Sequence, residues 1–89
     1  MGDGEGGATP LIWAAKAGRD ACVRRLLHAG AAVDAANAAG TTALIIAASL
    51  GREACVDRLL RAGAAVDAAD ADGATALIWA AKNGHTACV

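Results

Sequence analysis

The sequence repeats itself with a period of 33 residues, and this period constrains the fold more than any other feature. Residues 7–39 match residues 40–72 at 23 of 33 positions, and residues 73–89 match the start of the first unit at 13 of 17. A fixed period of this length indicates stacked units, none of which buries its apolar face alone. We therefore expect two complete repeats (7–39 and 40–72), a partial third (73–89), and a flexible Gly-rich lead-in over 1–6.

Each unit carries the signals of two short helices and a loop. In the first unit, Thr9 is a helix N-cap and Pro10 stands at the first helical position, where its missing N–H costs nothing. Gly18 is suited to a left-handed C-terminal cap. A second helix is expected over roughly 20–29, ending before Gly30, and the Asp and Asn residues that follow favour a turning connection. The prediction is an all-α solenoid of helix-turn-helix units joined by hairpin-like loops.

Cysteine recurs at the same position of every unit, as Cys22, Cys55 and Cys88. Equivalent positions on stacked helices lie about 8–10 Å apart, whereas a disulfide requires Cα atoms within about 7 Å. We therefore expect reduced thiols that fill the core as small hydrophobic groups, as in an intracellular protein. Cys88 is set apart, because no helix continues beyond it in this sequence. It is a candidate for exposure and for cross-linking two molecules.

Three stretches resemble the ankyrin repeat: "GATPLIWAA", "GTTALIIAA" and "GATALIWAA", the first two followed by "VRRLLHAGAAVD" and "VDRLLRAGAAVD". The resemblance covers 7–89 and implies two stacked helices and a hairpin-like loop in each unit. This chain departs from the family by having isoleucine in place of a histidine whose hydrogen bonds tie neighbouring loops together. Those ties must be made by other groups or be absent. Arg25 and Arg58 stand where the family has aliphatic residues, and we expect their stems to cover apolar surface with the charge in water.

Composition and charge exclude several functions. The net charge is -1, with acids and bases scattered along the chain, so no basic block is present to bind nucleic acid. The apolar runs are too short to span a bilayer, and the acidic start lacks the basic region of a signal peptide. We expect a soluble, cytoplasmic protein in a reducing compartment. The G-x-G-x-x-G match in "GDGEGG" lacks a preceding strand and is attributed to chance.

Catalytic and metal-binding constellations are also missing from the sequence. His85 and Cys88 have the spacing of half a zinc site, but a structural site requires four ligands and no second pair lies nearby. Neither Ser49 nor any threonine has a base and an orienting acid at plausible positions. Trp13 and Trp79 share one repeat position, and core filling is favoured over a ligand-stacking pair. The chain is therefore expected not to be an enzyme, and no cofactor or metal is expected.

The family resemblance implies protein recognition through the loop tips and the exposed face of the first helix. The positions carried over are Glu5, Lys16, Thr41, Ser49, Leu50, Asp72, Lys82 and Asn83, with the small neighbours Gly6, Ala8, Ala17, Ala38, Ala39, Ala71 and Ala74. Interface hot spots are enriched in Trp, Tyr and Arg, and none of these occurs among them. The positions therefore indicate a protein partner without identifying it.

The partial third unit leaves alternatives open. Its first helix, expected over Ala76–Asn83, lacks the second helix that would cover Leu77, Ile78, Trp79 and Ala81. We expect a fragment of a longer array. The alternatives are a self-associating module that pairs through this C-terminal edge, or an accessory segment of a larger enzyme or membrane protein. Units this similar also suit consensus design, although their uneven departures favour natural duplication.

Overall fold

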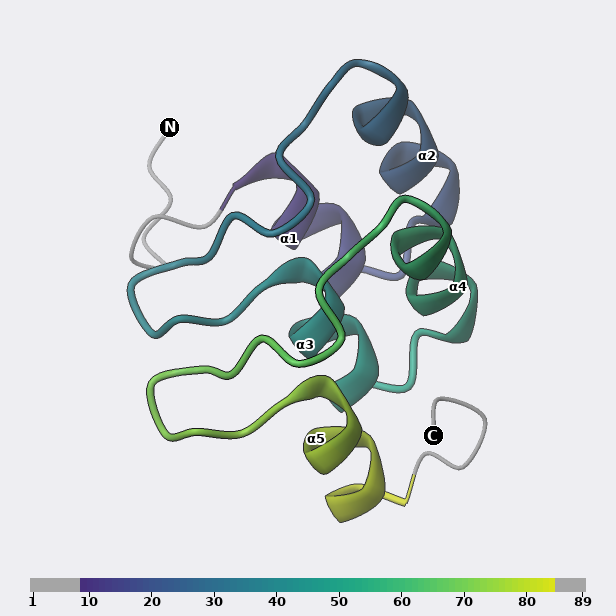
Figure 1. Cartoon of the computed structure of the whole chain (residues 1–89). Helices are drawn as coiled ribbons and strands as arrows, with labels where there is room; N and C mark the ends of the chain where they lie inside the picture. The colour runs from purple at the N-terminus through teal and green to yellow at the C-terminus, as the bar shows by residue number, and fades with distance from the viewer. Residues whose placement is uncertain (1–8, 85–89) are drawn as a thin grey trace.

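A computed structural model describes residues 9–84 as a stack of short helices (Figure 1). The helices of this range are α1 (Pro10–Lys16), α2 (Asp20–His28), α3 (Ala43–Ser49), α4 (Glu53–Arg61) and α5 (Ala76–Lys82). The first helices α1, α3 and α5 form one row, α2 and α4 form a second row, and two long loops project on the other side of the first row. The predicted all-α solenoid is confirmed. The lead-in over 1–6, with Glu5, and the His85–Cys88 pair lie outside the described residues.

Local signals determine where the first helices begin and end. Thr9, Thr42 and Thr75 are the N-caps, and each hydroxyl accepts the backbone N–H three residues on, at 3.1–3.4 Å. Gly18 and Gly51 follow the first two with φ of +72° and +71°, the left-handed conformation that glycine adopts without strain. The first helix of unit one begins at Pro10, as expected. The first helix of unit three ends at Lys82, one residue before the expected Asn83, and the second helix of unit one ends at His28 rather than at residue 29.

The connection between units is hairpin-like, as predicted. An isolated antiparallel bridge joins Ala36 to Thr42, and the Asn37 side chain closes the turn between them. Its Oδ1 accepts hydrogen bonds from the backbone N–H groups of Ala39 (2.9 Å) and Thr41 (3.0 Å). An Asx side chain that bonds the backbone two residues on is a typical turn former, and the next loop repeats the arrangement.

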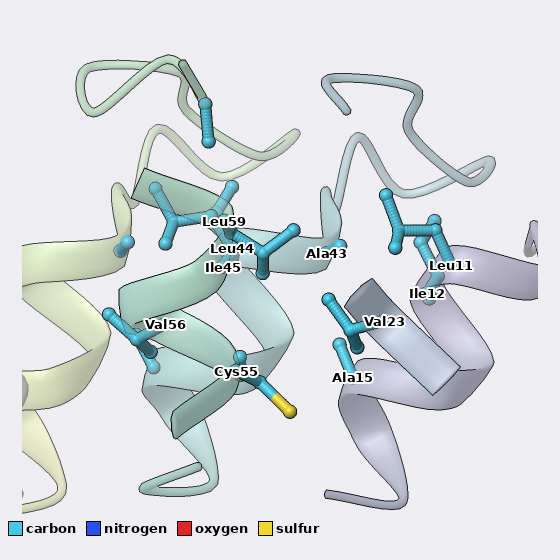
Figure 2. Close-up of a cluster of buried hydrophobic side chains, with 14 of the residues drawn as sticks. Leu11, Ile12, Ala15, Val23, Ala43, Leu44, Ile45, Cys55, Val56 and Leu59 are labelled. Carbon is cyan, nitrogen blue, oxygen red and sulfur yellow. The ribbon is translucent and has the colours of Figure 1, made fainter. Parts of the chain in front are cut away.

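The core lies between the two rows of helices and is built from small and aliphatic side chains (Figure 2). Ala15, Ala43, Ala47 and Ala80 are fully buried, so the helix backbones approach one another closely. The larger buried side chains are Leu11, Ile12, Val23, Leu44, Ile45, Cys55, Val56 and Leu59. Neighbouring units therefore share one continuous core, which is the way a repeat array gains stability.

Backbone groups and an aspartate make the loop-to-loop ties that the family's histidine would otherwise supply. The N–H of Ala71 in the second loop donates to the carbonyl of Ala39 in the first, at 2.8 Å. The N–H of Ala65 donates to Oδ1 of Asp34, also at 2.8 Å. Both bonds join one unit to the next, so the loss of the histidine does not leave the loops untied.

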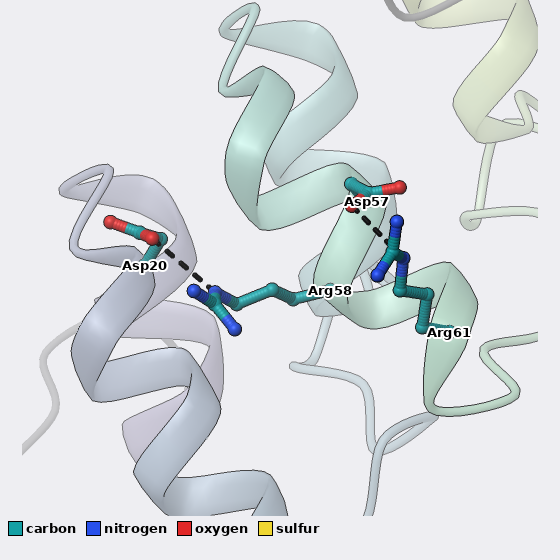
Figure 3. A network of polar contacts seen from close by, with 4 residues as sticks. All are labelled: Asp20, Asp57, Arg58 and Arg61. Carbon is teal, nitrogen blue, oxygen red and sulfur yellow. Dashed lines mark hydrogen bonds and ion pairs between the residues drawn. The ribbon is translucent and has the colours of Figure 1, made fainter.

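Side chains also tie the helix ends of neighbouring units. Arg52 Nε donates to the Lys16 carbonyl at 3.2 Å, and Asn83 Nδ2 donates to the Ser49 carbonyl at 2.8 Å. Each bond caps the C-terminal end of a first helix with a residue from the following unit. In the second row, Arg58 Nε lies 3.3 Å from Asp20 Oδ2 (Figure 3).

Several burial predictions were wrong, and position in the stack explains each error. Cys22 and Trp13 were expected in the core but are exposed, because they face the end of the stack where no described helix covers them. Cys55, at the same position as Cys22, is buried against unit one, with its sulfur directed towards Ala15 and Val23 (Figure 2). Trp79 was expected to be exposed in the absence of a second helix, but its side chain is half-buried.

The partial unit and the two arginines differ in how far they are exposed. Leu77, Ile78 and Ala81 are exposed, as predicted. Arg25 is exposed as well, with its charge in water. Arg58 differs, because it is half-buried and its guanidinium pairs with a carboxylate of the preceding unit rather than with solvent alone.

Candidate protein-interaction surface

The stacking of the first helices separates the predicted contact residues into two groups. Equivalent positions line up because α1, α3 and α5 run side by side in the same direction. One group lies at their C-terminal ends and is called here the helix-end ridge: Lys16, Ser49, Leu50, Lys82 and Asn83. The other group, Thr41 and Asp72, lies on the hairpin loops near the N-terminal ends. A seven-residue helix, about 10 Å long, separates them.

The two lysines of the helix-end ridge are held in place by tryptophans. Lys16 Nζ lies 5.0 Å from the ring centroid of Trp13, and Lys82 Nζ lies 5.3 Å from that of Trp79. Such cation–π contacts contribute about 0.5–1 kcal/mol at exposed sites. The contacts restrict the reach of each ammonium group, so the ridge carries one positioned cation near each end.

Leu50 provides an apolar centre between these cations. It follows α3 directly and is 42% exposed, although leucine side chains are usually buried. Because α3 packs against both α1 and α5, Leu50 at its C-terminal end belongs to the unit between those that carry Lys16 and Lys82. The Arg52 side chain extends from the same turn to the end of α1, where it adds a third cation. Arg52 was not among the contact residues predicted from the sequence, although arginine recurs after glycine in "GRD" and "GRE".

Ser49 and Asn83 have structural roles on the ridge. The Ser49 hydroxyl donates to the carbonyl of Ile46 at 2.9 Å, within its own helix. The Asn83 amide donates to the Ser49 carbonyl and so holds α5 against α3. These two residues fix the spacing of the ridge, while the exposed Leu50 and Lys82 and the half-buried Lys16 provide the groups available for contact.

The second hairpin loop is organised by Asp70. Oδ1 accepts from the N–H groups of Asp72 and Ala74, and Oδ2 accepts from the indole Nε1 of Trp79, each at 2.9 Å. The hydrogen bond from Trp79, together with those from the backbone, holds the pKa of Asp70 below its usual value. The loop tip that carries the exposed Asp72 is therefore anchored to α5, a link that sequence reasoning missed.

Two surface grooves lie away from the loop tips, and the larger adjoins the helix-end ridge at Trp13 and Ala17. The larger, about 570 Å³, opens at the end of the stack formed by unit one and is mainly apolar. It is lined by Pro10, Trp13, Ala14, Ala17, Arg19, Cys22, Arg25 and Leu26. The smaller, about 240 Å³, runs between α2 and α4 and includes Arg58 and Arg61, each paired with an aspartate (Figure 3).

The described residues present no arrangement typical of catalysis or metal binding. Over residues 9–84, no three His, Cys, Asp or Glu side chains are grouped to hold a metal ion. Burial, and secondarily the charge of Asp20, raise the pKa of the Cys55 thiol, which disfavours the nucleophilic thiolate. No helix in the described part of the chain has the length and apolar character needed to cross a membrane.

Comparison with known proteins agrees with this architecture. A family model that describes ankyrin repeats in three copies matches residues 11–89, which is nearly the whole chain. A search among curated proteins found no match.

Proposed function

The chain belongs to the ankyrin-repeat family, and from this premise we propose that it binds a protein partner through the helix-end ridge and the two hairpin-loop tips. Ankyrin repeats are generally protein–protein interaction modules and typically act as non-catalytic scaffolds. We propose the same surface for the 89-residue chain and for any longer array that contains it. We also propose that binding takes place in the reducing cytoplasm, because the buried Cys55 is a free thiol.

The observation that supports this surface is the exposure of Leu50 between two positioned lysines. A single exposed leucine is common on protein surfaces, so the support comes from its combination with the two positioned lysines. The ammonium groups of Lys16 and Lys82 favour carboxylates on either side of an apolar contact. The partner we propose is therefore a protein segment that presents one apolar side chain flanked by Asp or Glu.

The loop tips extend the surface beyond the ridge. Asp72 is exposed on the second loop, and the hydrogen bonds of Asp70 hold its backbone in place. A loop that is already ordered loses less conformational entropy when it binds. Thr41 is half-buried on the first loop and contributes less surface.

A peptide array tests the proposal directly. Synthetic peptides with a central Leu or Phe flanked by Asp and Glu are compared with peptides of the same composition in scrambled order and with Lys-flanked versions. We expect binding of the acidic-flanked set only, with NMR shift changes at Leu50, Lys16 and Lys82. Binding that is equal across all three sets, or shifts confined to other surfaces, contradicts the proposal.

Matched variants separate the ridge from general electrostatics. Lys82→Glu on the ridge and Arg24→Glu on the exposed face of α2 make the same change in net charge. We expect Lys82→Glu and Leu50→Glu to abolish peptide binding and Arg24→Glu to leave it within about twofold, since rim charges remote from a contact act weakly through solvent. Equal loss in Lys82→Glu and Arg24→Glu indicates nonspecific charge attraction instead.

A further inference from the structure

One end of the stack exposes a surface that is buried elsewhere in the same chain. Ile12 and Ile45 occupy equivalent positions and are 3% and 2% exposed, because each is covered by the unit that follows. Ile78 occupies the same position in the third unit and is 51% exposed. Leu77 beside it is also exposed. In the described structure, α5 thus presents the face that α1 and α3 use for stacking.

The other end exposes the complementary surface. Cys55 and Leu59 are buried because they face the preceding unit. Their equivalents in the first unit, Cys22 and Leu26, line the apolar groove of about 570 Å³, together with Trp13. This groove is the face that packs against a preceding unit in the internal interfaces, and we call it the receiving side. At unit one no described residues cover it.

The internal interfaces support a fit between the two surfaces along the row of first helices. Residues 77–81 have the sequence LIWAA, identical to residues 11–15 of α1, of which Leu11 and Ile12 lie in the core shared with α3. Within the chain, Trp79 lies half-buried on the receiving side of α5, against the core formed by α3, so this interface accommodates a tryptophan at that position. Trp13 is its equivalent in the open groove.

We propose that the chain stacks head to tail with a second copy of itself. The exposed face of α5 in one copy, centred on Leu77 and Ile78, enters the groove of unit one in the next copy, lined by Trp13, Cys22 and Leu26. The intermolecular contact continues the row formed by α1, α3 and α5. It adjoins the helix-end ridge at the ends of α1 and α5 but does not include Leu50, so it does not require the proposed partner.

A polar contact gives this stacking its register. Within the chain, Arg52 donates to the carbonyl of Lys16 at the end of the preceding first helix. Arg19 is the equivalent of Arg52 and lies at the rim of the open groove. In the head-to-tail arrangement it donates to the carbonyl of Lys82 at the end of α5. The bond orients the incoming copy as the next unit of the array.

The intermolecular contact is weaker than the internal ones. The second-row ion pair joins Arg58 to Asp20, and the residue equivalent to Asp20 in the third unit is Thr86, which carries no charge. We therefore expect reversible association rather than a permanent complex. Because the two surfaces differ, each added copy leaves one free groove and one free α5 face, so growth continues beyond the dimer.

Sedimentation velocity under reducing conditions tests the proposal. The sample is the 89-residue chain over about three decades of concentration, which covers dissociation constants from about 1 µM to about 1 mM. We expect the average mass to rise with concentration and to exceed twice the chain mass of 8.7 kDa without a plateau. An average mass that stays at one chain over the whole concentration range overturns the proposal, and it would mean that neither face binds a second copy. A plateau at the dimer overturns head-to-tail growth.

Blocking variants identify the two surfaces. Ile78→Glu alters only the α5 face, and Cys22→Glu alters only the groove; both positions are exposed, so circular dichroism should show an unchanged fold. Trp13→Glu is a second groove variant, in case Cys22→Glu loses helical signal. We expect each variant alone to be monomeric and an equimolar mixture of the two to form a 1:1 dimer, because each retains one complementary face.

The outcomes separate this proposal from its alternatives. If Cys22→Glu alone still forms a dimer, two α5 faces pair symmetrically and the head-to-tail arrangement is wrong. The control is Leu50→Glu, which introduces the same charge on the helix-end ridge, away from both ends. This variant should assemble like the unmodified chain but should no longer bind the acidic-flanked peptides. The control therefore distinguishes a failure of assembly from a failure of partner binding.

Discussion

The indole Nε1 of Trp79 donates a 2.9 Å hydrogen bond to Oδ2 of Asp70, nine residues earlier in the chain. The other carboxylate oxygen of Asp70 accepts two backbone N–H groups of the hairpin loop. One side chain therefore joins the loop to the face of α5 that stacks on α3. In the loop between units one and two, Asn37 makes the same two backbone contacts, and Ile46 stands where unit three has Trp79.

Stability should depend on the ionisation of Asp70. Its folded pKa lies below the unfolded value, so its contribution is fully present above the unfolded pKa of about 3.9 and is lost as the pH falls through the folded pKa. Asp70→Asn keeps the Oδ1 contacts, as Asn37 does, and loses the charged acceptor of Trp79. We expect the variant to be less stable at pH 7 and its stability to change less between pH 5 and acid, as measured by urea denaturation.

Asp72→Asn is the control for this experiment, because it removes one charge from the same loop and leaves the Trp79 bond in place. If Asp72→Asn reduces the acid dependence as much as Asp70→Asn does, the effect reflects overall charge and not the Trp79 bond.

Gly40 should tolerate a side chain less well than Gly73, which occupies the same position one unit later. Both have positive φ (+78° and +81°), where a left-handed residue other than glycine costs about 1–2 kcal/mol. A Cβ on Gly40 would also lie 3.0 Å from the backbone nitrogen of Ala71, which makes the loop-to-loop hydrogen bond, whereas nothing lies within 4 Å at Gly73. Urea denaturation should therefore show a larger loss for Gly40→Ala than for Gly73→Ala.

Ile45→Val and Ile78→Val make the same chemical change at one repeat position with opposite exposure. Ile45 is buried between units, so the loss of a methylene should reduce the free energy of unfolding by about 0.5–1.5 kcal/mol. Ile78 is exposed in the single chain, and its loss should stay within about 0.5 kcal/mol. Thermal or urea unfolding at dilute concentration measures both, and equal losses would mean that α5 is covered in the monomer.

Thiol labelling should distinguish the two described cysteines. Cys22 is exposed, whereas burial excludes reagents from Cys55 and raises the pKa of its thiol. In a Cys88→Ser chain, mass spectrometry should find Cys22 modified first by an aromatic disulfide reagent and Cys55 modified only as the protein unfolds. Both should react at comparable rates in urea, and equal rates without urea would contradict the burial of Cys55.

Much of the surface proposed for partner binding could be placed from the sequence, because it depends on the period. Once the first helices stack in one direction, residues such as Lys16 and Lys82 must fall on the same ridge. The contacts that give the ridge its chemistry could not be placed in this way. The lysine–tryptophan contacts and the Arg52 bond depend on side-chain conformations and on the distance between units, which repeat spacing does not encode.

The repeat, the helix starts at Thr9, Thr42 and Thr75, and the hairpin-like loops could all be predicted from the sequence, because caps and turns are local interactions among residues close in the chain. Burial within an equivalent set followed from the packing of the units. Cys22 and Cys55 have nearly the same neighbours in sequence and were both expected in the core, yet the first is exposed and the second is buried. Burial depends on whether another unit packs against the residue, and identical repeats do not specify which of them lies at an end.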